Sequence, residues 1–266
     1  MCGIIGFTGN EPAKDIIIGG LERLEYRGYD SAGLALLSND QIQVRKRTGK
    51  VEELRKLCEA EKMPATCGIG HTRWATHGKP SKENAHPHQD NSKSISVVHN
   101  GIIENYSELR SLLEKDGYKF YTDTDTEVIP NLIHYYYTKE LKLNSDKTIK
   151  TFLKAVRDCC SDLNGSFAIE VICKDFPKNM IVVRKDSPLV IGTCENEKYI
   201  SSDIPAILSY TRDFYLLNDL EYVVLENDNI SFYNDNLQEI EKKPCNIEWS
   251  AAASEKNGYE DFMSKE

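Results

Sequence analysis

The start of the chain most constrains what it can fold into. Residues Cys2-Gly3-Ile4-Ile5-Gly6-Phe7 form an apolar run punctuated by glycines, which predicts a short buried strand. Chain ends are usually frayed, so a buried start requires a sheet built around it. If Met1 is removed, Cys2 carries a thiol and a free α-amine, whose ordinary pKa of roughly 7.7–8.0 suits a base near neutral pH. Cys2 is therefore either a small buried core residue or a nucleophile that carries its own base.

The composition argues against several classes of protein. A length of 266 residues suits one large domain or two small ones. The formal net charge of −9 argues against broad binding to nucleic acids or anionic membranes. No stretch approaches the run of about 18 apolar residues that crosses a bilayer, and the start does not have the pattern of a secretory signal. The eight cysteines form no C-x-x-C pair, so we expect the seven other than Cys2 to be reduced, mostly structural thiols in a cytoplasmic protein.

The spacing of apolar residues predicts an α+β fold with at least one large, two-layered sheet. We expect one domain over residues 1–241 and a polar, irregular tail over residues 242–266. Asn39-Asp40 predicts a hairpin between two early strands. The expected helices cover residues 12–24, 51–60, 105–115, 126–139 and 148–159, with a helical turn at 205–208. The expected strands cover residues 2–7, 31–37, 41–45, 67–74, 95–99, 167–173, 180–184, 189–193, 199–202, 214–217 and 222–225.

The segment His71–Gly78 is the richest in candidate site residues. Arg73, at the end of a predicted strand, could donate two hydrogen bonds to a carboxylate or form only a surface ion pair. Trp74 could close over a ligand and exclude water, or be a core aromatic residue. Five of the six histidines fall between residues 71 and 99. They include no H-x-x-x-H pair and have no C-x-x-C nearby, so we predict no metal site.

Two further segments each allow a structural and a chemical interpretation. Asn100-Gly101 could be a hairpin turn, but the sequence after it is helical, so an oxyanion-binding pair of amide donors is the alternative. The segment Thr122–Glu127 precedes a predicted helix and suits a helix cap, while Asp125 could instead bind a substrate ammonium group. A calcium loop is rejected because Val128 occupies the position that requires glycine, counting from Asp123.

Taken together, these segments resemble the class II (N-terminal-nucleophile) glutamine amidotransferases, and within them the branch that supplies ammonia for glucosamine 6-phosphate synthesis. The resemblance covers essentially the whole chain and implies a four-layer αββα sandwich without a cofactor. The segments that carry it are Cys2–Ile4, Tyr26–Gly33, His71–Gly78, Asn84–His88, His99–Gly101, Thr124–Glu127 and Ser187–Gly192.

The resemblance also implies a role for each candidate residue. Cys2 would be the nucleophile, with its own α-amine as the base, and Asn100 and Gly101 would form the oxyanion hole. Arg73 would bind the α-carboxylate of glutamine and Asp125 its α-ammonium group. Trp74, Thr76 and His77 would belong to a loop that closes over the substrate, with Arg27 and His86 supporting the site.

The implied reaction hydrolyses the side-chain amide of L-glutamine to glutamate and ammonia through a Cys2 thioester. The family places sugar-isomerase domains after a tail like this one, and the longer protein is expected to be a homo-oligomer. Three alternatives stay open. They are an amidotransferase domain with another ammonia acceptor, an amidohydrolase that acts on a different amide, and a non-catalytic module that senses glutamine.

Overall fold

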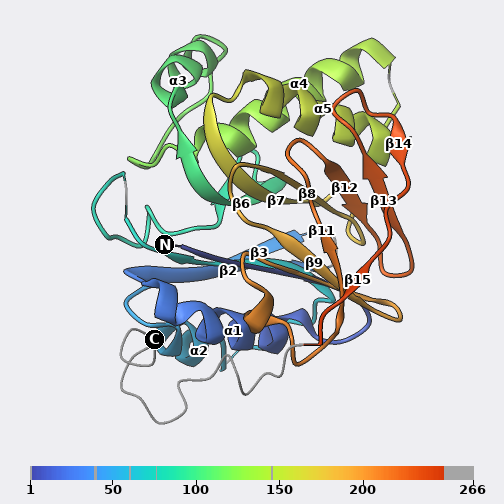
Figure 1. Cartoon of the computed structure of the whole chain (residues 1–266). Coiled ribbons are helices and arrows are strands. Elements are labelled where there is room, and N and C mark those ends of the chain that lie inside the picture. Colours follow the sequence, from blue (N-terminus) through green and yellow to red (C-terminus); the bar gives the residue numbers. More distant parts are fainter. Residues whose placement is uncertain (1, 39–40, 60, 76, 145, 249–266) are drawn as a thin grey trace.

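The chain forms four layers. The computed structural model describes residues 2–248 apart from 39–40, 60, 76 and 145. Its strands form two antiparallel sheets that stack face to face, and helices cover both outer surfaces (Figure 1). The order helix, sheet, sheet, helix is the αββα sandwich that the family resemblance implied. The predicted early hairpin is confirmed, because Ser31–Ser38 pairs antiparallel with Gln41–Thr48, and only residues 39–40 between them lie outside the described part.

The first sheet buries the start of the chain, as predicted. Within the described residues its order is β15-β11-β9-β10-β1-β4-β2-β3, so β1 is hydrogen-bonded on both sides. Cys2 immediately precedes this interior strand. The strands are β1 (Gly3–Thr8), β2 (Ser31–Ser38), β3 (Gln41–Thr48), β4 (Cys67–Arg73), β9 (Val190–Cys194), β10 (Glu197–Ser201), β11 (Asp213–Leu216) and β15 (Cys245–Asn246).

The second sheet carries the other half of the candidate residues. Its order in the described part of the chain is β14-β13-β12-β8-β7-β6-β5, and β6 pairs with β7 along its whole length. The strands are β5 (His88–Gln89), β6 (Ile95–Ile103), β7 (Gly165–Cys173), β8 (Met180–Lys185), β12 (Tyr222–Leu225), β13 (Ile230–Tyr233) and β14 (Glu239–Ile240).

Helices cover the outer face of each sheet (Figure 1). Against the first sheet lie α1 (Ala13–Leu24) and α2 (Val51–Glu59), and against the second lie α3 (Tyr106–Lys115), α4 (Val128–Asn144) and α5 (Ile149–Asp162). Two 3₁₀ turns, Glu25–Arg27 and Ile204–Ala206, complete the helical elements. In the ranges that the structure describes, no helix combines the length and apolar character needed to cross a membrane.

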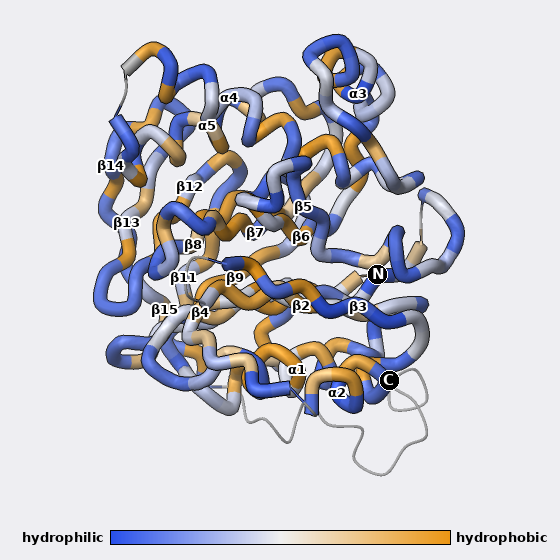
Figure 2. Tube along the Cα trace, turned by 180° about the vertical axis from the view of Figure 1, so that it is seen from behind, coloured by the Kyte–Doolittle hydropathy of each residue, from blue (hydrophilic) through white to orange (hydrophobic). Residues whose placement is uncertain are grey.

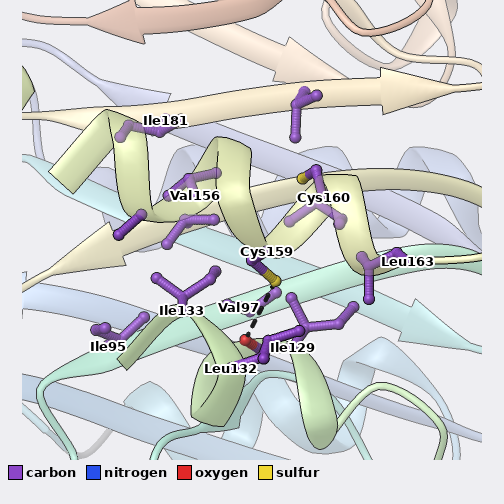
Figure 3. Packing of buried hydrophobic residues seen from close by; sticks show 14 of the residues in the cluster. Ile95, Val97, Ile129, Leu132, Ile133, Val156, Cys159, Cys160, Leu163 and Ile181 are labelled. Carbon is purple, nitrogen blue, oxygen red and sulfur yellow. Dashed lines mark hydrogen bonds between the residues drawn. The ribbon is translucent and has the colours of Figure 1, made fainter. Parts of the chain in front are cut away.

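Apolar side chains fill each space between layers, because successive residues of a strand face opposite sides. Ile4 packs between the two sheets, whereas Ile5 and Phe7 pack beneath α1. The tube coloured by hydropathy shows this apolar interior along the strands and helices (Figure 2). Between the second sheet and its helices, the thiol of Cys159 lies 3.8 Å from the Ile129 carbonyl oxygen within an aliphatic cluster (Figure 3).

Helix α1 continues through Gly19-Gly20, a pair that weakens helix propensity. A Cβ atom on Gly20 would lie 2.8 Å from the side chain of Ile5. The glycine therefore lets α1 approach β1 closely, and the packing contact offsets the low propensity.

Several segments differ from the sequence-based expectation: strands β5, β13 and β14 were not expected, and two further segments pair differently. Strand β6 does not end at His99 but continues to Ile103, so Asn100-Gly101 lies inside a strand and forms no hairpin turn. Past residue 241, Cys245 and Asn246 pair with β11, so part of the expected irregular tail is an edge strand. Both segments are held by strands distant in the sequence, which local patterns do not reveal.

Candidate active site

A cavity of about 470 Å³ lies where β1, β4 and β6 meet, and it brings the predicted residues together. Arg27, Arg73, Asn100 and Asp125, from four separate segments, line it with Cys2. Thr76 lies outside the described residues. The other predicted residues that line the cavity are Trp74, His77, His86 and Gly101.

Cys2 lies beside the residue that follows β4. The Trp74 amide nitrogen donates to the Cys2 Sγ at 3.1 Å, and the Sγ lies 3.5 Å from the Trp74 carbonyl oxygen. Burial is the largest influence on the thiol and raises its pKa, while the hydrogen bond from the Trp74 amide acts in the opposite direction. A thiol with a raised pKa needs a base beside it to become a nucleophilic thiolate.

Arg73 ends β4 with its side chain buried and turned back over the loop that follows. Its guanidinium donates to the carbonyl oxygens of His77, Gly78 and Lys79. It also lies 3.6 Å from the Asp30 carboxylate, because the pairing of β2 with β4 places Ser31 opposite Arg73. A buried cation at the edge of a cavity can bind an anionic group of a ligand.

Asn100 and Gly101 occupy the opposite wall, on β6. The Asn100 Nδ2 donates to the Cys2 carbonyl oxygen at 3.2 Å. Gly101 has a φ of +130°, and a Cβ there would lie only 2.0 Å from the Ser166 carbonyl oxygen of β7. Only glycine fits this backbone, which combines positive φ with close approach of a neighbouring strand.

Asp125 closes the cavity near the start of α4. Its carboxylate accepts a hydrogen bond of 2.9 Å from the Ile103 amide at the end of β6, so it ties the α4 segment to that strand. The neighbouring Glu127 accepts hydrogen bonds from the amides of Tyr121 and Thr122 and thereby holds the loop before the helix. The cavity thus carries a buried cation, Arg73, and a buried anion, Asp125.

The remaining predicted residues line the cavity in different ways. Trp74 is 54% exposed, and its indole ring covers Gly28, where a Cβ would meet it at 2.6 Å. His77 contacts Tyr106 edge-on, with ring centroids 5.6 Å apart. Arg27 donates to the Ser202 carbonyl oxygen and pairs with Asp203, which connects the cavity to the end of β10.

Sequence reasoning assigned no role to several residues around the cavity. Asp30 contacts Arg73 and accepts a hydrogen bond from the Ala75 amide. His71 bonds to Asn100, and His99 bonds to Thr126. Asp30 and His71 belong to segments that carried the family resemblance, so that context is the only sequence signal for them. Ser187 and Pro188 also line the cavity.

Four buried histidines lie at or near the β6 wall, and of these His86 and His99 line the cavity, whereas His71 and His88 do not. Burial lowers the pKa of each ring, to about 3 for His71 and well below the ordinary value for His86 and His88. These rings are therefore neutral near pH 7. Within the described part of the chain, no group of three or more His, Cys, Asp or Glu side chains is arranged to hold a metal ion.

Comparison with known proteins identifies this arrangement. The model of the glutamine amidotransferase domain matches residues 71–209, more than half of the chain. The chain belongs to the glutamine amidotransferases. Its class is the one with an N-terminal nucleophile, in agreement with the position of Cys2 at the edge of the cavity.

Curated amidotransferase relatives match along the entire chain. Glutamine–fructose-6-phosphate aminotransferase (isomerizing) of Clostridium perfringens is 49% identical over 266 residues. The protein of the same name from Aquifex aeolicus is 46% identical over 266 residues. These matches cover 100% of this chain but only 42% and 43% of the two relatives. The chain therefore spans less than half the length of the curated relatives it matches.

Solved amidotransferase structures share the fold. Glutamine phosphoribosylpyrophosphate amidotransferase from B. subtilis superposes with a TM-score of 0.72 at 26% sequence identity. The superposition covers 90% of this chain and 50% of that one. A glutamine aminotransferase class-II domain protein from Silicibacter pomeroyi has a TM-score of 0.55 at 11% identity, and this likeness concerns the fold alone.

Proposed function

We propose that this chain is the glutaminase part of a longer enzyme and that it hydrolyses the side-chain amide of L-glutamine. The observation that carries the proposal is the single cavity lined by Cys2, Arg73, Asn100 and Asp125. The cavity combines a thiol, a cation, an anion and amide donors, which match the reacting amide and both charges of a free amino acid.

The chemistry follows from these groups. The Cys2 Sγ forms a bond to the amide carbon of glutamine, and the thiol proton passes to a base. Once Met1 is removed, that base is the α-amine of Cys2, directly or through a water molecule. The tetrahedral oxyanion accepts hydrogen bonds from the Asn100 side chain and the Gly101 amide. The C–N bond breaks, the proton leaves with ammonia, and water then cleaves the thioester to release glutamate and the thiol.

The head of glutamine is held at both of its charges in this proposal. The Arg73 guanidinium binds the α-carboxylate, and the Asp125 carboxylate binds the α-ammonium group. Trp74, Thr76 and His77 form the loop that covers the substrate and excludes water, and Arg27 and His86 support the cavity walls. No metal or organic cofactor takes part.

The ammonia acceptor is proposed from the relatives. Those with 46–49% identity are named for fructose 6-phosphate, whereas the structure named for phosphoribosylpyrophosphate is 26% identical. We therefore assign the chain to glucosamine 6-phosphate synthesis, with sugar-isomerase domains in the longer protein, which we expect to be a homo-oligomer. All eight cysteines lie in the described ranges and are free thiols, which supports a reducing, cytoplasmic location.

The decisive experiment replaces the nucleophile. Cys2→Ala should reduce glutamate release to background while the affinity for glutamine changes by less than about threefold, because binding depends on other residues. A glutamine-like diazo-ketone should label the wild type once per chain and leave Cys2→Ala unlabelled. Cys194→Ala is the matched control, because Cys194 is an exposed thiol outside the cavity.

Mass spectrometry must first establish whether Met1 is present. With Met1 attached, the nitrogen of Cys2 is part of a peptide bond and cannot act as the base, so we expect that form of the protein to be inactive. Glutaminase activity that survives in Cys2→Ala would refute the proposed nucleophile. Glutamine binding without turnover in the Met1-free wild type would instead favour a sensing module.

A further inference from the structure

His71 contacts Asn100 from the side away from the cavity. Its ring projects from β4, and its Nε2 lies 2.9 Å from the Asn100 Oδ1 and 3.0 Å from the His99 carbonyl oxygen. The His71 residue is only 1% exposed and does not line the cavity. It therefore lies behind a proposed oxyanion donor and has no direct path to a ligand.

The surrounding partners determine which atoms carry hydrogen. The Cys2 carbonyl oxygen only accepts hydrogen bonds, so the Asn100 atom that faces it is Nδ2. The Asn100 Oδ1 therefore faces His71, and the His99 carbonyl is also an acceptor, so the Nε2 of His71 carries the hydrogen. The Nδ1 is buried without a hydrogen-bond partner among the described residues, which fits a neutral ring with no hydrogen on that atom.

We propose that His71 is a positioning residue for glutamine hydrolysis, whose Nε2–H holds the Asn100 amide in the orientation that stabilises the oxyanion. One hydrogen of the Asn100 Nδ2 then bonds to the Cys2 carbonyl, and the other is directed into the cavity. This inference rests on the proposed function and adds a residue to it.

Reversal of the Asn100 amide would be unfavourable in this setting. It would place an N–H against the Nε2–H of His71 and an oxygen against the Cys2 carbonyl oxygen, and it would leave buried polar groups unpaired. The His71 ring is itself fixed, because it stacks on His86 with centroids 4.0 Å apart and an interplanar angle of 17°. Burial lowers the pKa of His71 to about 3, so the ring stays neutral throughout the working pH range.

The first test compares two replacements of His71. His71→Phe keeps an aromatic ring against His86 but removes the donor, while His71→Gln can place an amide N–H near the lost Nε2–H. An oxyanion donor contributes about 10²–10³ in rate, and misorientation forfeits part of this. We expect kcat to fall about 10- to 100-fold in His71→Phe, with KM within about threefold, and to recover most of this loss in His71→Gln. His134→Phe, on α4, is the control and should leave kcat unchanged.

Two further measurements separate positioning from general damage. In an Asn100→Ala background, His71→Phe should lower kcat by less than about twofold, because its effect acts through Asn100. Alkylation of Cys2 by iodoacetamide is a displacement that forms no oxyanion, so its rate should stay within about twofold of wild type in His71→Phe. An undiminished effect in the Asn100→Ala background, or an equal loss of alkylation, would overturn the inference.

Nuclear magnetic resonance tests the contact without relying on activity. The Asn100 side-chain amide should give two resolved, slowly exchanging proton signals in the wild type. In His71→Phe these signals should exchange faster and move toward free-amide values. Unchanged Asn100 signals would refute the inference even if the enzyme were active. If the wild type hydrolysed no glutamine, the proposed function would fail. The resonance measurement would still decide whether His71 holds the Asn100 amide in place.

Discussion

Buried polar side chains differ in their hydrogen bonding, and the clearest contrast is between the proposed site residues Asn100 and Asp125 and the acid Glu170. At the cavity, Asn100 and Asp125 have hydrogen-bond partners on neighbouring segments. Glu170 of β7 is fully buried, and neither carboxylate oxygen has a partner among the described residues. It faces Gly6 of β1, where a Cβ would lie 2.6 Å from the Glu170 Oε2.

The difference teaches that burial alone does not make a polar residue part of the chemistry. A partnered group is held in one orientation, which is what stabilisation of a transition state requires. An unpartnered buried acid remains protonated and lowers stability instead. Substitutions at the cavity should therefore change kinetic constants, whereas substitution of Glu170 should change stability and leave kcat intact.

Apart from replacement of Cys2, substitution of Gly101 is expected to have the largest effect on catalysis among the changes at the cavity. Gly101→Ala would force a Cβ against the Ser166 carbonyl oxygen in a backbone with φ of +130° and displace the Gly101 amide from the oxyanion position. We expect kcat to fall by at least about 10²-fold, measured as glutamate release by folded protein. Stability should also fall by about 1–3 kcal/mol, as measured by urea unfolding.

Gly117→Ala is a matched control for this change. Gly117 also has positive φ, +87°, but nothing lies within 4 Å of the added Cβ. This variant should lose stability by about 1 kcal/mol and keep the wild-type kcat. If Gly101→Ala lost only as much activity as Gly117→Ala, the cavity would not depend on a fixed oxyanion donor and the comparison would fail.

Arg73 should affect binding more than turnover. Arg73→Ala removes charge-assisted hydrogen bonds worth about 1.5–3 kcal/mol, so we expect KM for glutamine to rise about 10- to 100-fold while kcat changes less. Arg73→Lys keeps the charge but loses the forked geometry, and it should be intermediate. Arg110→Ala, on the exposed face of α3, should change neither constant. Loss of kcat at constant KM in Arg73→Ala would show that the role assigned to Arg73 is wrong.

Much of the molecule was predictable because it depends on local patterns. The apolar run at Cys2–Phe7 predicted an interior strand, and β1 lies between β4 and β10. The mixture of helices and short strands predicted the two-layered sheet. The residues to which the family resemblance assigned roles also line one cavity, wherever the structure describes them.

The remaining features depend on contacts between distant segments. Asn100-Gly101 resembles a turn locally, and only the approach of β7 explains a glycine inside a strand. The proximity of Asp30 and Arg73 depends on the register of β2 against β4, which the sequence does not reveal. The role of His71 depends on Asn100, which lies 29 residues away. Strand β15 has little apolar character of its own and is defined by its pairing with β11.

The last prediction concerns Glu170, the buried carboxyl group without a hydrogen-bond partner among the described residues. Burial raises the pKa of its carboxyl well above the ordinary 4.5, so the folded protein holds this proton at a pH where the unfolded chain has released it. The contribution of Glu170 to stability is therefore greatest below about pH 4.5 and decreases as pH rises toward the folded pKa, by at most about 1.4 kcal/mol per pH unit. Glu170→Gln removes this dependence because an amide does not titrate.

Urea unfolding of both proteins between pH 5 and pH 8 measures the effect. As pH rises, the unfolding free energy of the wild type should decrease relative to that of Glu170→Gln. The kcat of the variant should match that of the wild type. Glu114→Gln, at an exposed position of α3, should keep the wild-type pH dependence. Parallel curves for wild type and Glu170→Gln would mean that the carboxylate is accommodated in its ionised form. Glu170 would then be accommodated as well as Asn100 and Asp125 are, and the contrast between them would be lost.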